Sequence, residues 1–446
     1  MQEENKIFTV EEVREMLDQK GKGGVKQSLS NCVTAITYDP ILSGTIKRND
    51  LTCQTDIVGN VTWDRRGTAL TDTDMNQIML LLEVNYELCN DKNIKKAIGI
   101  VSSREHYHPI VDMLESLKWD GKERIRDLFP RYLGSEQSDY VYEATKLMML
   151  GAISRVYTPG CKFETMVCVV GGQGAGKSTL FRFLAIKDEW FSDDLRKFDD
   201  DNVYRRLQGH WFIEMAEMTA TVNARSIEEI KAFISRQKET YKIPYEIHPE
   251  DRPRQCVFVG TSNSIEFLPF DRSGNRRFVP IEIDASKAEC HPLDDVKTCR
   301  EFILQCWAEA MVIYKLGDFQ LTMPRKLEEK IREMQATFTP EDTRKGIILM
   351  WLETCNEVFV CTSMIYDYAL KRFGTEPTKK DLREITGIMN EFATDWEYVA
   401  SHRFRQYGIQ RGWKKKGGVI TVKEPETDGN GFMKISDKTL EEIPFR

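Results

Sequence analysis

Residues 165–185 read TMVCVVGGQGAGKSTLFRFLA. An apolar run is followed by four glycines within six residues, then a lysine, a serine and a second apolar run. The motif G-x-x-x-x-G-K-[ST] between an expected strand and an expected helix predicts a loop that wraps a phosphate. Glycines let the backbone turn without Cβ clashes, so that successive N–H groups and the start of the helix point at one anion. We therefore expect a nucleoside triphosphate to bind here.

The expected cofactors are ATP and Mg²⁺. We expect Lys177 to neutralise the outer phosphates and Ser178 to offer its hydroxyl to Mg²⁺. A glycine-rich turn without a ligand needs neither side chain at these positions. The predicted nucleotide-binding residues are Gly171, Gly172, Gln173, Gly174, Ala175, Gly176, Lys177, Ser178 and Thr179.

Short apolar runs at 165–170, 211–215, 256–260 and 278–283 alternate with helical patterns. Such alternation predicts an α/β fold, and the apolar character of each run is typical of buried parallel strands. The fold class we predict is therefore α/β, with the glycine-rich motif in its core.

Polar side chains follow two of these strands. Glu214 ends the run at 211–215, and Glu217 comes three residues later. Thr261 and Asn263 follow the next run, and ligands collect at the carboxyl edge of such sheets. We expect Glu214 to hold Mg²⁺ and Glu217 to orient the attacking water, with the reverse division left open. Asn263 is expected to hold the water or the γ-phosphate, unless it is a turn residue.

Two arginines, Arg276 and Arg277, stand directly before the last run. A guanidinium presented to the nucleotide of a neighbouring subunit stabilises transition-state charge, as an arginine finger does. This interpretation implies a homo-oligomer. The alternative is an arginine pair beside acidic surface groups.

Three regions follow from these patterns. Residues 1–155 are predicted to form a helical accessory region or collar, and residues 156–338 the ATPase domain. Residues 339–446 are predicted to form a small winged-helix-like domain, with helices near 363–373 and 379–392. The first 100 residues show no paired acids or metal cluster that would indicate a polymerase.

Basic residues interleaved with aromatic ones fill positions 401–416, which contain no acid. This pattern favours a strand that grips the backbone of DNA, although a solvated basic strand has the same composition. The candidate DNA contacts in this stretch are Arg403, Arg405, Arg411 and Lys414.

The composition is that of an ordinary globular protein, with 446 residues, 41% hydrophobic residues and a formal net charge of -7. No apolar run approaches the length of a membrane span, and the first residues lack the pattern of a secretory signal. We therefore expect a cytoplasmic protein without a membrane partner. The eleven cysteines have no zinc-ligand spacing.

In its longer segments the chain resembles the virulence-associated E family, a phage and mobile-element group related to superfamily 3 helicases within the AAA+ ATPases. The segments that carry the resemblance are WDGKER at 119–124, GGQGAGKST at 171–179, WFIEMAEM at 211–218, residues 235–263, GNRRF at 274–278 and YGIQRGW at 407–413.

The resemblance implies a P-loop NTPase core and a hexameric ring, with ATP sites between subunits and DNA in a central channel. It also implies that Arg277, before the phenylalanine, is the finger. Superfamily 3 chains commonly carry two adjacent acids, whereas here Glu214 and Glu217 are three residues apart. A channel hairpin matches residues 242–254, where the candidate DNA contacts are Lys242, Tyr245, His248, Arg252 and Arg254. A solvated hairpin is the alternative, because three acids dilute its charge.

The leading functional hypothesis is an ATP-dependent helicase or translocase that acts on single-stranded or forked DNA, with other replication proteins as further partners. A second is an origin-binding or helicase-loading factor that uses ATP only as a switch. A third is a small-molecule kinase, which the order of Asn263 and Arg277 after the acids disfavours.

Overall fold

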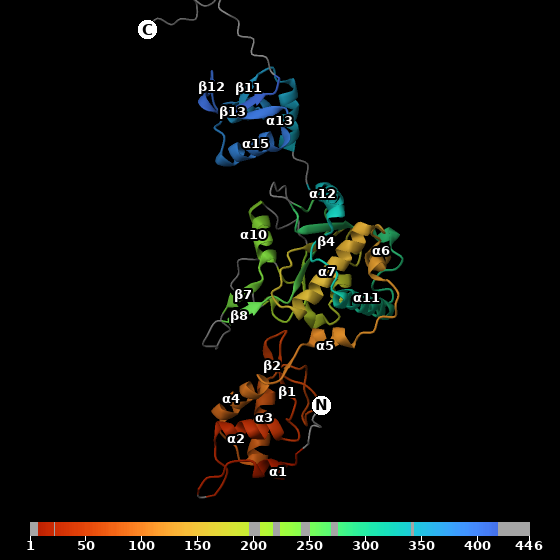
Figure 1. Ribbon diagram of the computed structural model, residues 1–446, viewed down its shortest axis with the longest axis vertical. Helices are drawn as coiled ribbons and strands as arrows, with labels where there is room; N and C mark the ends of the chain where they lie inside the picture. Colours follow the sequence, from red (N-terminus) through yellow and green to blue (C-terminus); the bar gives the residue numbers. More distant parts are fainter. Residues whose placement is uncertain are drawn as a thin grey trace, which may run out of the picture. The chain divides into compact units, whose positions relative to one another are not determined.

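The structure is a computed structural model in which the chain divides into two compact units, Met1–Pro340 and Glu341–Arg446 (Figure 1). The predicted boundary after residue 155 falls inside helix α7 (Asp139–Tyr157), and the division into three regions stays a prediction. Within the described part of the chain, no helix combines the length and the hydropathy needed to cross a bilayer. The structure describes residues 8–21, 23–195, 206–216, 224–241, 250–268, 275–339 and 343–417.

The first part of the larger unit combines helices with a small sheet. Strand β1 pairs antiparallel with β2 and parallel with β3. This region is rich in helices, as expected, and it also contains strands that were not predicted, formed by the short polar runs IKRN and QTDI. The elements are α1 (Val10–Glu15), α2 (Leu29–Tyr38), β1 (Ile46–Asn49), β2 (Gln54–Ile57), α3 (Asp72–Tyr86), α4 (Asp91–Ser102) and β3 (His106–Tyr107).

A parallel sheet forms the centre of the larger unit, which confirms the predicted mixed α/β class. Its strand order is β10-β4-β9-β6-β5, and every neighbouring pair is parallel. The four strands predicted from apolar runs are confirmed, whereas the two-residue β5 was not predicted. The strands are β4 (Met166–Val170), β5 (Phe191–Ser192), β6 (Phe212–Met215), β9 (Val257–Ser262) and β10 (Phe278–Glu282).

Helices cover both faces of this sheet. Because side chains alternate along a strand, Val167 and Val169 of β4 join a core with α7, α8 and α11, while Cys168 faces a second core with α10. Figure 1 shows α7 and α10 on opposite sides of the strands. The remaining helices are α5 (Pro109–Ser116), α6 (Leu128–Leu133), α8 (Lys177–Leu184), α10 (Ala224–Ser235), α11 (Val296–Leu316) and α12 (Glu328–Thr337).

Two buried tryptophans join the elements that carry the glycine motif and the first acid. Trp211, directly before β6, stacks on Trp307 of α11 with ring centroids 4.4 Å apart. The indole N–H of Trp307 donates to the Leu184 carbonyl at the end of α8, and that of Trp211 donates to the Ala152 carbonyl of α7. These contacts through Trp307 hold the end of helix α8 close to the start of strand β6.

The smaller unit has an antiparallel sheet of order β11-β13-β12. The basic stretch at 401–416, predicted to lie in a strand, forms a hairpin from the end of β12 and β13. The helix predicted at 379–392 is confirmed, and the one predicted at 363–373 is shorter, consisting of α14 and a π-helical turn. The elements are α13 (Thr343–Thr354), β11 (Phe359–Cys361), α14 (Thr362–Met364), the π-helical turn (Ile365–Ala369), α15 (Lys379–Phe392), β12 (Trp396–Phe404) and β13 (Gly408–Lys415).

Candidate functional site

The glycine loop, residues 171–176, joins β4 to α8 at the carboxyl edge of the parallel sheet. Gly174 and Gly176 have φ values of 77° and 82°, which other residues rarely adopt. A Cβ on Gly171 would lie 2.6 Å from the Ile283 carbonyl oxygen, so only glycine fits against the end of β10. These local requirements explain why the loop takes this course before the helix begins at Lys177.

A pocket of about 390 Å³ lies over the glycine loop. The carboxyl ends of β6 and β9 contribute residues to it, as expected of a ligand site in an open α/β sheet. The segment after β10 adds His291 and Leu293, which no sequence motif indicated. The lining residues are Gln173, Gly174, Ala175, Gly176, Lys177, Ser178, Thr179, Ala216, Thr261, Ser262, Asn263, His291 and Leu293.

The ammonium group of Lys177 is held by three oxygen acceptors. Its Nζ donates to the carbonyl oxygens of Gly171 at 2.8 Å and Gly172 at 2.7 Å, and to Asn263 Oδ1 at 2.9 Å. Burial lowers the pKa of Lys177, and the nearby Glu214 opposes that shift. The hydrogen bond between Lys177 and Asn263 was not predicted, and the expected role of Asn263 toward water or the γ-phosphate stays a prediction.

Glu214 is fully buried at the end of β6. Its Oε1 accepts hydrogen bonds from Ser178 Oγ at 2.6 Å and Thr261 Oγ1 at 2.5 Å. Its Oε2 is buried and has no hydrogen-bond partner among the described residues. Burial raises the pKa of Glu214, while the two hydroxyl donors lower it. Asp193, after β5, adds a like charge that raises this pKa further and was not predicted as a site residue.

The two predicted finger arginines stand at the other edge of the sheet. Phe278, the first residue of β10, pairs with Met166, the first residue of β4. Five residues of strand, about 17 Å at the usual rise, therefore separate Arg277 from the carboxyl edge where the glycine loop lies. Arg277 Nε lies 3.4 Å from Glu164 Oε2, whereas Arg276 is exposed.

Glu217, Lys242, Tyr245 and His248 lie outside the described residues, so their predicted roles stay predictions. The structure describes the two strands that flank the last three of them. These are β7 (Lys238–Tyr241) and β8 (Glu250–Pro253), which pair antiparallel as the hairpin prediction requires.

Arg254 is buried rather than available to DNA, which corrects the prediction. Its Nε donates to Glu239 Oε1 at 2.8 Å, and its guanidinium also donates to the Phe233 carbonyl. The guanidinium lies 4.4 Å from the Phe233 ring centroid. Arg252 is buried as well. Neither arginine is therefore available to contact DNA as predicted. The sequence of charged residues at 242–254 does not indicate whether an arginine side chain faces inward or outward.

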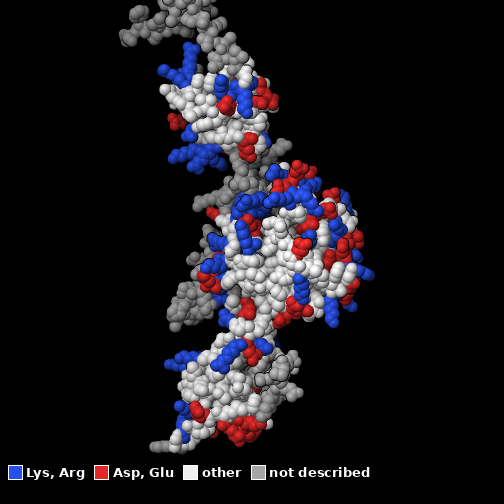
Figure 2. All heavy atoms as spheres, in the orientation of Figure 1, with Lys and Arg blue, Asp and Glu red and all other residues white. Residues whose placement is uncertain are grey.

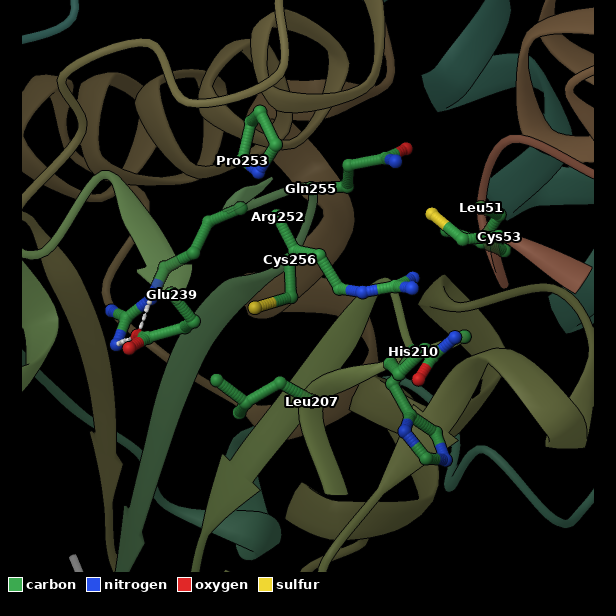
Figure 3. Close-up of a pocket in the computed structure, with 12 residues that line it drawn as sticks. Leu51, Cys53, Leu207, His210, Glu239, Arg252, Pro253, Gln255 and Cys256 are labelled. Atoms are coloured by element: carbon green, nitrogen blue, oxygen red, sulfur yellow. Dashed lines mark hydrogen bonds and ion pairs between the residues drawn. The ribbon is translucent and has the colours of Figure 1, made fainter. Parts of the chain in front are cut away.

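Figure 3 shows the small pocket next to this hairpin, where Arg252 points toward Cys53 and His210. Its volume is about 50 Å³, which suits a few water molecules rather than a nucleotide. Gln255 links the hairpin to the first part of the unit by donating to the Asp50 carbonyl at 2.7 Å. This pocket thus lies where the hairpin contacts the first part of the larger unit.

In the smaller unit, Arg403, Arg405 and Arg411 are exposed, and Lys414 is half-buried. None of the four forms an ion pair with any residue that the structure describes in this unit. Figure 2 shows Lys and Arg of the smaller unit gathered near β12 and again near the start of α15, whereas the visible face of the larger unit mixes both signs. The predicted basic hairpin is therefore accessible.

Comparison with known proteins identifies a family. The model of the virulence-associated protein E-like domain matches residues 114–340, just over half of the chain. Among curated protein sequences, no match was found. The apo structure of the NrS-1 C-terminal region (305–718) is 14% identical, with a TM-score of 0.46 over 83% of this chain and 96% of that one. An A-form apo structure of the same region gives 13% and 0.45. TM-scores this low support no conclusion about the fold or the function of this chain.

Proposed function

This chain belongs to the family of proteins with a virulence-associated protein E-like domain, and we propose that it is an ATP-dependent DNA helicase or translocase. It acts in the replication of a phage or mobile genetic element, in the cytoplasm of the host. The larger unit is a P-loop ATPase of the AAA+ class that works as an oligomeric ring. The smaller unit is a winged-helix-like domain that anchors DNA.

One observation carries the proposal. Lys177, Ser178 and Asn263 line one pocket over the glycine loop, and Ser178 and Lys177 join it to two other elements: Ser178 donates to the buried Glu214 of β6, and Lys177 donates to Asn263 after β9. A cation, a hydroxyl, a carboxylate and an amide are the groups that position phosphates, a metal ion and water for phosphoryl transfer. A glycine-rich turn that binds no ligand does not require these four groups close to one another.

The residues present fit Mg²⁺. Magnesium prefers oxygen ligands, and Ser178 Oγ and Glu214 would hold it directly or through water, because Glu214 Oε2 is buried without a partner among the described residues. When bound, the ion supplies positive charge to the phosphate oxygens. Lys177 keeps a second positive charge at the loop, since its ammonium already lies against two loop carbonyls and Asn263.

Hydrolysis needs two further groups. Glu217 is the proposed group that orients the attacking water, three residues beyond Glu214. The proposed finger is Arg277 or Arg276 of a neighbouring copy. An arginine at the amino edge of the sheet does not serve the loop of its own chain, which lies at the carboxyl edge.

Steady-state ATP hydrolysis with and without single-stranded DNA, together with unwinding of a forked duplex, tests the proposal. We expect DNA to stimulate turnover strongly and the fork to be unwound, and we expect Lys177→Ala to abolish both. Slow turnover that DNA does not stimulate, with ATP-dependent protection of one duplex site, would support an assembly switch instead. A phosphorylated small product without any DNA effect would support a kinase.

A further inference from the structure

A large cavity in the smaller unit is lined in part by the basic hairpin. Its volume is about 690 Å³, enough for a nucleotide. The end of α13, the segment before β11, the π-helical turn and the end of β12 form its walls. Five aromatic side chains and one histidine line it, whereas no Phe, Tyr or Trp lines the proposed phosphate site. These rings are Trp351, Phe359, Tyr368, Phe404 and Tyr407, with His402 beside them.

Two of the lining rings form a flat stack. Phe359 of β11 and His402 of β12 have centroids 3.8 Å apart and planes only 6° from parallel. Phe404 meets His402 edge-on at 4.9 Å. Gly412, on the strand between β11 and β12, has no side chain there, and a Cβ would lie 2.7 Å from the Phe404 ring. Gly412 thus leaves room for the Phe404 ring, which meets the His402 member of the stack edge-on.

Cations accompany the stack. Arg403 and Arg405 line the cavity and are exposed, and Lys414 Nζ lies 5.9 Å from the Phe359 ring centroid. The lining includes one acid, Glu357, and the amides of Asn356 and Gln406. A ligand that suits this cavity has a flat ring to extend the stack, polar ring edges for the amides, and a negative group for the arginines.

We propose that this cavity takes an unpaired nucleobase of single-stranded DNA, which extends the Phe359–His402 stack while the adjoining phosphates lie against Arg403 and Arg405. Every base has a π-face, so such a platform holds a strand without reading its sequence. The choice of DNA as ligand rests on the proposed function. The inference adds a base-binding site to a hairpin otherwise expected to contact only the backbone.

The test uses the full chain without ATP and an oligothymidylate of about 12 nucleotides that carries one 2-aminopurine. Stacking quenches 2-aminopurine fluorescence, and anisotropy of the labelled strand gives the affinity. We expect strong quenching with the wild type. Phe359→Leu and His402→Leu should each lose the quenching and weaken binding by at least about fivefold, the lower bound for one aromatic stack.

Tyr398→Leu is the matched control, since Tyr398 is an exposed aromatic of β12 outside the cavity, and its quenching should equal that of the wild type. Thermal melting establishes that each variant is folded. Unchanged quenching in folded His402→Leu would overturn the inference, as would a free 2-aminopurine nucleotide that binds as tightly as the strand. Strand binding without quenching overturns only this inference, whereas no DNA binding in any form also overturns the proposed function.

Discussion

At the scale of single residues, Lys177 is buried, and its ammonium group faces oxygen atoms. Three acceptors hold its ammonium, and burial lowers its pKa. An ammonium that is less hydrated interacts more strongly with an incoming anion than one on the open surface does. The lysine is therefore placed to respond to phosphate charge at the mouth of the loop.

Replacing Lys177 with alanine tests this placement. We expect kcat for ATP hydrolysis to fall by about 100- to 1,000-fold, the usual effect of removing one group that stabilises developing charge. Lys187→Ala is the control, because Lys187 is an exposed lysine that follows α8. Equal turnover in the two variants would remove Lys177 from the site.

Glu214 gives the protein a pH dependence of known sign. Because burial raises its pKa, the folded protein keeps a proton there at pH values where the unfolded chain has lost it. Stability therefore falls as the pH rises from the ordinary glutamate pKa through the raised one. Above that window, and without Mg²⁺, Glu214→Gln should have a larger free energy of unfolding than the wild type, and the difference should vanish at lower pH.

Chemical denaturation across a pH series measures this difference. Adding Mg²⁺ with a non-hydrolysable ATP analogue should reverse the order, since the charged form of Glu214 then has a partner and only the wild type gains fully. A wild type that is the more stable protein at neutral pH without metal would contradict the account of Glu214.

At the scale of elements, the pair of Arg254 and Glu239 ties the end of β8 to β7 and to α10 through the Phe233 carbonyl. Both side chains are buried. Removing Arg254 leaves the buried Glu239 with Arg236 at 3.6 Å as an ion-pair partner, so Arg254→Ala should reduce the free energy of unfolding by about 3 kcal/mol, the lower end for breaking a buried pair. Arg405→Ala, an exposed arginine of the other unit, should leave it nearly unchanged. Urea denaturation distinguishes the two, and equal stability would show that Arg254 is not structural.

The elements that carried local signals were predictable from the sequence. The strands around 165–170 and 256–260 are fully apolar, and the glycine loop has a motif whose spacing reflects its backbone geometry. Glu214, near the end of β6, and Asn263, directly after β9, had to lie at the same sheet edge if the strands are parallel. The rule that ligands collect at the carboxyl edge was therefore enough to find both residues.

Other features depend on packing that no local pattern records. His291 lines the pocket because the segment after β10 packs against the glycine loop, where a Cβ on Gly176 would lie 2.9 Å from His291 Nε2. Asp193 follows β5, a strand of only two residues. Such a strand is too short to show an apolar run or an alternation of apolar and polar residues in the sequence. Arg254 looked like a DNA contact because sequence reports charge and not the direction in which a side chain points.

At the scale of the whole molecule, the separation of the arginines from their own glycine loop is what the proposed sharing of the site between two copies requires. Arg276 and Arg277 lie at the amino edge of the sheet, whereas Lys177 lies at the carboxyl edge. A site completed by a neighbour requires a heterologous interface, which closes into a ring when its rotation allows. Particle mass with and without ATP and forked DNA gives the number of subunits.

Mixing inactive variants tests this sharing of the site. Lys177→Ala and the double variant of Arg276→Ala and Arg277→Ala should each be inactive alone. Mixed in equal amounts, they should regain activity at about one quarter of the interfaces, those where an intact lysine meets an intact arginine of the neighbour. A mixture as inactive as its components would contradict a shared site. The two single arginine variants then identify which of the pair acts.

Binding of Mg²⁺·ATP to the purified full chain, measured by isothermal titration calorimetry, tests the central claim most directly. The account predicts saturable binding at one site per chain, with clearly weaker binding in Lys177→Ala and wild-type affinity in Lys187→Ala. If the wild-type chain took up no triphosphate with magnesium present, the glycine loop would not be a nucleotide site, and the proposed motor would be wrong.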